Sequence, residues 1–312
     1  MSLFKSLTKK VTKGDKYGHF GYLFILPFFI VMAIFIVYPI LNTFYLSLTK
    51  WDGATVAPEW IGLQNFSRLF KDIATGGIFL KSIKNTWILW GCNVFPQFVA
   101  ALALAILLTD KTSKLRGKEF FRAIYYLPNL VTMASIGALF SFLLSYPKGA
   151  VNEILVAFKI LDGPFNFLQN VWATRLSVST ILTWMWFGYT MIIFMAGLKA
   201  IPEELFEAAR VDGATKWQVF KNITLPQLRP IMTYQIVTSI IGGLSMYDIP
   251  AVLTGGTGAP QNSVTTMVMH IYRQGFFNYN LGYASAVAIG LFVHIFIVVA
   301  FAVKFMNLKE AN

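Results

Sequence analysis

The 312-residue sequence has very little charge, and this scarcity sets the class of protein. Only 13% of its residues are Asp, Glu, Lys or Arg, whereas 56% are hydrophobic and the mean hydropathy is +0.60. A soluble chain of this length does not have enough interior to bury so much apolar surface. The composition therefore excludes an ordinary soluble domain and indicates a membrane protein.

Residues that perform catalysis or hold metals are also scarce. The one cysteine, Cys92, can form no internal disulfide, and the three histidines are scattered without an H-E-x-x-H spacing. There is no G-x-S-x-G, and no G-x-x-x-x-G-K-[ST] to cradle phosphates, since the one Gly-Lys pair, Gly117-Lys118, is followed by Glu119. We therefore predict no catalytic residue, no metal site and no cofactor bound by this chain, which is not expected to be an enzyme.

Long apolar runs, in contrast, are abundant. Six stretches of about 20 residues or more are almost free of charge, which is the length that a helix needs to cross about 30 Å of hydrocarbon. All six should be helices, because lipid offers no hydrogen-bond partner to an open strand edge. The sequence thus predicts an all-α membrane protein with spans at 20–48, 87–109, 124–146, 176–198, 231–253 and 283–306.

The distribution of Lys and Arg predicts the orientation. The larger share of these 26 residues lies in the N-terminal tail, the 110–122 and 199–230 loops and the C-terminal end. The richer side should be cytoplasmic, with both termini inside. The net charge of +12 then reflects topology and attraction to anionic lipid, and nucleic-acid binding is less favoured because no basic stripe carries interleaved aromatics. We expect tails at 1–19 and 307–312 around one membrane domain at 20–306.

The outer segment 49–86 carries an amphipathic patch. Its apolar residues have a helical spacing that suits a short helix lying on the membrane surface. These residues are Trp60, Leu63, Phe66, Leu69 and Phe70.

A charged segment at 201–230 interrupts the apolar runs and reads as a cytoplasmic helix-turn-helix. Pro202 suits a first helical position, and Gly213 is placed to end the helix in a left-handed conformation. Thr215 and Gln218 have the spacing of a capping box for a second short helix, which Pro226 and Pro230 should stop before the fifth span begins. Local physics alone leaves two interpretations open, a surface connector between spans or a docking element for a soluble partner.

The spacing of this segment resembles a known family. Glu207-Ala208-Ala209, Gly213 and Ile223-Thr224-Leu225-Pro226 fit E-A-A-x₃-G-x₉-I-x-L-P, the "EAA" loop of ABC importer permeases. The longer "IPEELFEAARVDGA" is similar to the carbohydrate branch, which takes up oligosaccharides or glycerol-3-phosphate. Segments 120–140, 184–202, 246–258 and 276–290 resemble the family as well, except that Thr257 departs from its frequent T-G-G-G-P.

The resemblance implies a mechanical role for the loop at 201–226. In that family it is the coupling helix that sits in a cleft of the ATPase subunit. Carried over, the coupling residues are Glu207, Ala208, Ala209, Asp212, Gly213, Ile223, Leu225 and Pro226. The implied partners are a second homologous permease, two copies of a cytoplasmic ATPase that uses ATP and Mg, an extracytoplasmic solute-binding protein, a sugar and membrane lipid. The implied location is the bacterial cell membrane.

A sugar site needs aromatic plates and small neutral hydrogen-bonding groups, which the fourth and fifth spans offer. With the resemblance, the candidate pathway residues are Trp184, Phe187, Gly188, Met191, Thr238, Gly242 and Ser245. The competing interpretation is ordinary span chemistry, since aromatics often face lipid and glycines often allow helices to approach. No Arg or Lys cluster lies among these residues, which favours a neutral mono- or oligosaccharide over glycerol-3-phosphate.

An ion-coupled secondary transporter is the alternative from another class. It would need ionisable groups within the membrane, and the spans offer Asp248 and His294. We interpret Asp248 as a loop anchor and His294 as a packing histidine that hydrogen-bonds a neighbour. Two isolated groups make a poor proton relay, so the importer is the preferred hypothesis.

Overall fold

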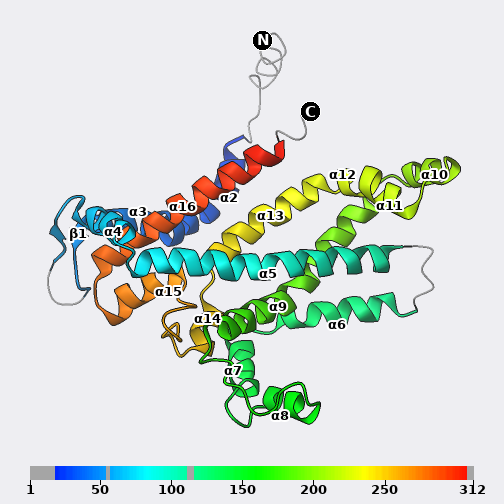
Figure 1. The fold of residues 1–312 in the computed structure, drawn as a ribbon. Helices are drawn as coiled ribbons and strands as arrows, with labels where there is room; N and C mark the ends of the chain where they lie inside the picture. Colours follow the sequence, from blue (N-terminus) through cyan, green and yellow to red (C-terminus); the bar gives the residue numbers. More distant parts are fainter. Residues whose placement is uncertain (1–17, 54–56, 111–115, 308–312) are drawn as a thin grey trace.

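The computed structural model describes residues 18–53, 57–110 and 116–307, and these residues are mostly helical (Figure 1). Two short strands, β1 (Thr49–Lys50) and β2 (Glu59–Trp60), form an antiparallel pair in which Thr49 faces Trp60. The helices, with π-helical segments labelled η, are α2 (Gly18–Met32), η1 (Ala33–Val37), α3 (Tyr38–Ser47), α4 (Gln64–Ala74), α5 (Ile78–Thr109), α6 (Lys118–Leu130), α7 (Met133–Leu143), α8 (Ala150–Ala157), α9 (Val171–Lys199), α10 (Glu203–Val211), α11 (Lys216–Val219), η2 (Phe220–Thr224), α12 (Leu225–Gln227), α13 (Arg229–Leu244), α14 (Asp248–Leu253), α15 (Met267–Tyr272), η3 (Arg273–Phe277) and α16 (Leu281–Asn307).

Five helices in the described chain are long and apolar enough to cross a membrane. They are Tyr22–Ser47, Ile78–Thr109, Val171–Lys199, Arg229–Leu253 and Leu281–Met306. They correspond to five of the six predicted spans, so the expectation of a multi-span helical protein is confirmed.

The remaining predicted span, 124–146, is not one straight helix. The structure has α6 and α7 there, bent by 92° where they meet, and the pair makes a sixth span only if it is counted as one broken span. Val131 and Thr132 are extended, Pro128 precedes them, and the Thr132 hydroxyl accepts a hydrogen bond from the Ser135 N–H that starts α7. The proline thus lies where α6 ends, and the Thr132 cap begins α7. Both lie within one apolar run, so hydropathy alone predicts a single continuous span.

The bundle is built around α5 and α9, which pack along each other, with α6 against α9 and α13 against α16. Figure 1 shows α5 crossing the middle of the molecule. The buried cluster between α5 and α9 includes Ala101, Ala105, Met191 and Phe194, where small side chains on α5 face large ones on α9. In α16, His294 accepts a hydrogen bond from the Trp87 indole N–H at 3.1 Å, so the packing role predicted for it is confirmed.

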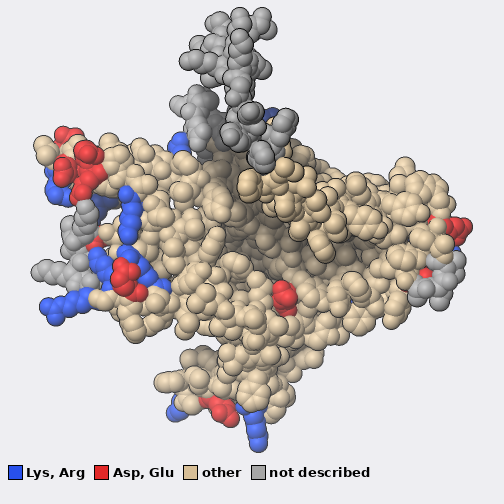
Figure 2. All heavy atoms as spheres, turned by 180° about the vertical axis from the view of Figure 1, so that it is seen from behind, with Lys and Arg blue, Asp and Glu red and all other residues tan. Residues whose placement is uncertain are grey.

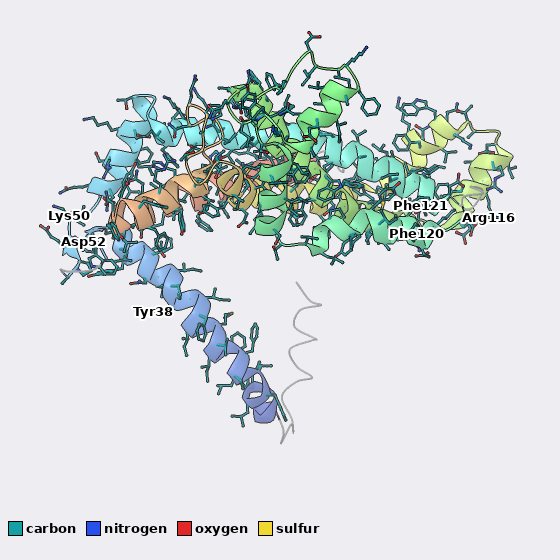
Figure 3. All side chains as sticks on the ribbon, turned by 90° about the horizontal axis from the view of Figure 1, so that it is seen from below. Tyr38, Lys50, Asp52, Arg116, Phe120 and Phe121 are labelled. Atoms are coloured by element: carbon teal, nitrogen blue, oxygen red, sulfur yellow. The ribbon has the colours of Figure 1, made fainter. Side chains whose placement is uncertain are left out.

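The first span stands apart from this bundle. Figure 3 shows the helix that carries Tyr38 extending away from the other elements. No residue of its most apolar 18-residue stretch is buried against the rest of the chain. Its α3 end packs on α16. Its surface is therefore suited to lipid or to another membrane helix.

Gly188 sets the distance between α6 and α9. A Cβ at this position would lie 1.9 Å from the backbone carbonyl oxygen of Tyr125, which cannot move without α6. Gly188→Ala is expected to force the two helices apart and cost about 1–3 kcal/mol of stability, measured as a lower unfolding temperature in detergent. Gly91→Ala is the matched control, because no atom lies within 4 Å of the added Cβ there. An unchanged unfolding temperature for Gly188→Ala would contradict this close packing.

His270 in α15 lies outside the candidate spans and is buried, 3% exposed, beside the rings of Phe79 and Tyr283. Burial lowers its pKa to about 4; nearby Asp72 raises it, while Arg273 and Arg68 lower it. An unfolded histidine takes up its proton near pH 6.5, so between pH 6.5 and about 4 the unfolded state binds more protons.

The stability of the chain should therefore fall as the pH drops through this window, with a contribution from His270 of up to about 3 kcal/mol. We expect the acid-induced drop in unfolding temperature between pH 7 and 4.5 to be smaller in His270→Leu. Equal drops in the two proteins would show that His270 is not a neutral buried group.

Candidate functional site

A cavity of about 450 Å³ opens between α5, α9, α13 and α14. Its described lining comprises Asn93, Gln97, Phe98, Met133, Leu182, Trp186, Tyr189, Thr190, Gln235, Thr238, Ser239, Gly242, Gly243, Ser245, Met246, Tyr247, Asp248, Ile249 and Pro250. Figure 2 shows that uncharged residues make up nearly all of the hollowed middle of the rear face, while charged residues gather toward its ends. A solute of a few rings would fit in this volume.

Three buried amides give the cavity its polar character. Asn93 and Gln97 come from α5 and Gln235 from α13, and each is at most 6% exposed. The Gln97 amide NH₂ donates to the Thr190 hydroxyl at 2.8 Å, and the Asn93 carbonyl oxygen accepts from the Thr183 hydroxyl at 3.1 Å.

In Asn93 and Gln97 these bonds use only one of the two polar groups of the amide. The Asn93 NH₂, the Gln97 carbonyl oxygen and the Gln235 NH₂ have no hydrogen-bond partner among the described residues. In an apolar surrounding such groups favour a ligand with hydroxyls that can both donate and accept.

Aromatic rings form the apolar part of the lining. Trp186 and Tyr189 of α9 meet edge to face with ring centroids 6.0 Å apart, and Tyr247 lies 5.1 Å from Tyr272 in the same measure. Asp248, expected to anchor a loop, is an exposed member of the lining and its one charged residue among those described. The cavity thus combines ring faces, amides and hydroxyls, as binding of a polar, uncharged solute with apolar faces requires.

The structure places the predicted pathway residues in two groups. Thr238, Gly242 and Ser245 of the fifth span line the cavity, whereas the four residues from the fourth span are not among its lining. Trp184 packs on Phe140, Phe187 on Tyr125, Gly188 on the backbone of α6, and Met191 in the α5–α9 core.

The cavity face of α9 is instead formed by Leu182, Trp186, Tyr189 and Thr190. Their spacing of three and four residues marks one side of a helix, adjacent to the side chosen from the sequence. Sequence reasoning also missed Asn93, Gln97 and Gln235, although an amide within an apolar run is the signal that could have found them.

The loop at 201–226 folds as two short helices joined by a left-handed glycine. Gly213 has φ +70°, and its N–H donates to the Arg210 carbonyl at the end of α10. At the start of α11 both bonds of the Thr215–Gln218 capping box are present. Pro226 lies in the first turn of α12, where a proline needs no N–H partner, and the helical run that begins at α11 ends at Gln227. Pro230 lies in the first turn of α13, so the two prolines mark the passage to the fifth span as predicted.

The predicted coupling residues divide into an exposed tip and a packed base. Glu207, Ala208, Asp212 and Gly213 are exposed, and Ala209 is buried at 8%. Ile223 packs against the cluster that contains Leu198 and Leu228, while Leu225 and Pro226 are half-buried.

The tip of this loop also presents large apolar side chains. Val211 is 88% exposed and Trp217 is 68% exposed, with the Trp217 ring 5.4 Å from that of Phe220. Figure 3 shows α10 and the start of α6, marked by Arg116, Phe120 and Phe121, at the same end of the molecule. The base thus ties the loop to the spans while the tip is available to a partner.

Residues 97–306 match the family described as binding-protein-dependent transport system inner membrane component. The chain is 33% identical over 269 residues to the lactose transport system permease protein LacF of Rhizobium radiobacter, covering 86% of this chain and 87% of that protein. It is 30% identical to the trehalose/maltose transport system permease protein MalF of Thermococcus litoralis, covering 97% of each, and 31% identical to the sn-glycerol-3-phosphate permease protein UgpA of Agrobacterium fabrum, covering 92% and 94%. Among solved structures, a chain of a bacterial alginate ABC transporter in complex with an alginate-bound periplasmic protein is similar, with a TM-score of 0.78, 25% identity and coverage of 92% and 93%.

Proposed function

This chain belongs to the binding-protein-dependent transport system inner membrane component family, and from that membership we propose that it conducts a neutral sugar through the cavity between α5, α9, α13 and α14. It is a permease subunit of an ABC importer, a membrane component and not an enzyme, and ATP hydrolysis belongs to a separate subunit. The relatives that transport lactose and trehalose or maltose support a carbohydrate substrate.

The observation that carries the proposal is the lining of the cavity. Its amides and hydroxyls suit sugar hydroxyls, and its aromatic rings suit the apolar faces of the sugar ring. The described lining contains the carboxylate of Asp248 and no Lys or Arg, whereas a phosphate-bearing solute would favour cations. A neutral mono- or oligosaccharide therefore fits better than glycerol-3-phosphate, despite the similarity to the glycerol-3-phosphate permease.

We further propose that the α10–α11 tip docks in a cleft of the ATPase subunit. The exposed Val211 and Trp217 supply the apolar contact, and the packed base at Ile223 transmits the movement of the tip to α13. Closure of the ATPase pair on ATP and Mg would then push this loop and switch the cavity between its inward- and outward-facing states. The loop end is cytoplasmic in this proposal, and so are both termini.

In this proposal the complete importer contains a second homologous permease, two ATPase subunits and an extracytoplasmic binding protein in the bacterial cell membrane. The solved alginate transporter, which is in complex with an alginate-bound periplasmic protein, supports the binding protein of this proposal. The exposed apolar surface of the first span agrees with burial against lipid or a partner permease.

The test is purification of the tagged chain in detergent from its native host, followed by reconstitution into liposomes. We expect a second permease and an ATPase to co-purify, and sugar uptake to require ATP and the binding protein and to resist an uncoupler. A chain that purifies alone, transports without ATP and is stopped by an uncoupler would overturn the importer in favour of an ion-coupled carrier.

A further inference from the structure

One face of α4 holds this helix firmly against the bundle. Asn65 is buried, and its side-chain NH₂ donates to the carbonyls of Ser47 at 2.9 Å and Thr49 at 2.8 Å. Leu69, one turn later, is buried in the cluster that contains Tyr283 and Leu291 of α16. These contacts fix which side of α4 faces away from the protein.

The apolar arc of α4 is wider than the face that the bundle covers. At 100° per residue, Leu69, Ile73 and Phe66 lead directly to Phe70 and Leu63 around the helix. Phe70 and Leu63, however, are 67% and 70% exposed. The opposite side carries Gln64, Arg68, Lys71 and Thr75, all exposed. The bundle therefore covers one part of the apolar arc of α4, and the part that contains Phe70 and Leu63 is left uncovered.

This uncovered edge is continuous with the first span. Trp60 of β2 is 62% exposed and its ring lies 6.2 Å from that of Tyr45, at the end of α3. Aromatic residues with polar atoms are typical of the level where hydrocarbon meets headgroups. Figure 1 shows α4 beside α3 and the β1 end of the molecule. The medium that surrounds the first span thus extends over the edge formed by Trp60, Leu63 and Phe70.

Lysines flank this edge. Lys71 lies in the last turn of α4, and Lys81 and Lys84 lie in the first turns of α5; all three are exposed. Between α4 and α5 the chain turns at Gly76 and Gly77. The Asp72 carboxylate accepts a hydrogen bond from the Phe79 N–H at 2.8 Å across this turn. The turn therefore presents positive charge next to the apolar edge.

We propose that residues 60–84 form a phospholipid-binding anchor. Trp60, Leu63 and Phe70 insert among the acyl chains at the surface, and Lys71, Lys81 and Lys84 bind lipid phosphates, with a preference for anionic headgroups. The anchor would hold β2 and α4 at a fixed depth in the membrane surface. This proposal is based on the packing and exposure of α4, and it does not depend on which solute is transported.

Site-directed spin labelling of the assembled transporter in phospholipid nanodiscs tests the insertion. In a Cys92→Ser background, single cysteines replace Leu63 and Phe70 on the apolar edge or Gln64 and Thr75 on the polar side. Labels at 63 and 70 should collide with oxygen several-fold more than with a water-soluble nickel chelate, and labels at 64 and 75 should show the reverse. Labels at 63 and 70 that meet the nickel chelate, or that lose both collisions only when the binding protein is added, would overturn the proposal, the second result in favour of a protein partner.

The lysines are tested by lipid composition. The unfolding temperature of the wild-type transporter should rise when phosphatidylglycerol is added to phosphatidylethanolamine nanodiscs, and Lys71→Gln/Lys81→Gln/Lys84→Gln should lose most of that rise. Lys148→Gln/Lys159→Gln, which removes two exposed charges near α8, is the matched control and should keep it. An equal rise in the triple variant would overturn the headgroup assignment.

Discussion

Replacing Gly213 by proline is expected to abolish sugar uptake while leaving the chain in the membrane. Gly213 has φ +70°, whereas the proline ring holds φ near −65°, and proline lacks the N–H that Gly213 donates to Arg210. The turn between α10 and α11 would therefore be lost. A penalty of about 3 kcal/mol or more corresponds to a reduction in coupled transport of about two orders of magnitude.

The measurements are uptake and sugar-stimulated ATP hydrolysis in proteoliposomes that contain the full transporter. Both should be lost, with the amount of chain in the membrane unchanged, because no atom lies within 4 Å of a Cβ at Gly213 and the damage is confined to the turn. Gly213→Asn is the matched control, since asparagine tolerates the left-handed conformation and should keep most of the uptake. Normal uptake in Gly213→Pro would contradict the coupling role of the loop.

The spans and the two short helices of the 201–226 loop could be predicted because their signals are local. Apolar length alone located five spans, and the glycine and capping-box spacings located the turn and the second helix of the loop. The span at 124–146 was predicted as one helix, and it breaks just after Pro128. Hydropathy does not record this break, because an apolar run has the same mean hydropathy whether its helix is continuous or interrupted.

The face of a span that lines the cavity could not be predicted in the same way. A helix hydrophobic on all sides carries no moment to show which side meets protein, lipid or cavity. In α9, Trp184 and Trp186 are chemically equivalent in the sequence, yet one packs on Phe140 and the other lines the cavity. The packing of α9 against α5 and, through Gly188, against α6 fixes which of the two side chains faces the cavity.

Gln235→Leu is expected to reduce uptake of the neutral sugar by about 10- to 100-fold. A buried amide that bonds a sugar hydroxyl in the pathway contributes about 1–3 kcal/mol, because its loss leaves that hydroxyl without a partner in an apolar surrounding. Gln235 is 3% exposed, borders the cavity, and has no protein partner for its NH₂ among the described residues. Its carbonyl oxygen accepts only a long bond of 3.4 Å from Thr238, whose hydroxyl also bonds the carbonyl of Tyr234 at 3.0 Å.

Leucine is close to glutamine in size, so the substitution leaves no large void and removes almost nothing that holds the fold together. The unfolding temperature and the ATP hydrolysis measured without sugar should therefore match those of the wild type, while uptake falls. Gln169→Leu, which alters an exposed glutamine outside the cavity lining, is the matched control and should transport normally. Full uptake by Gln235→Leu would show that the sugar does not pass the α13 wall of this cavity, and would contradict the proposed pathway.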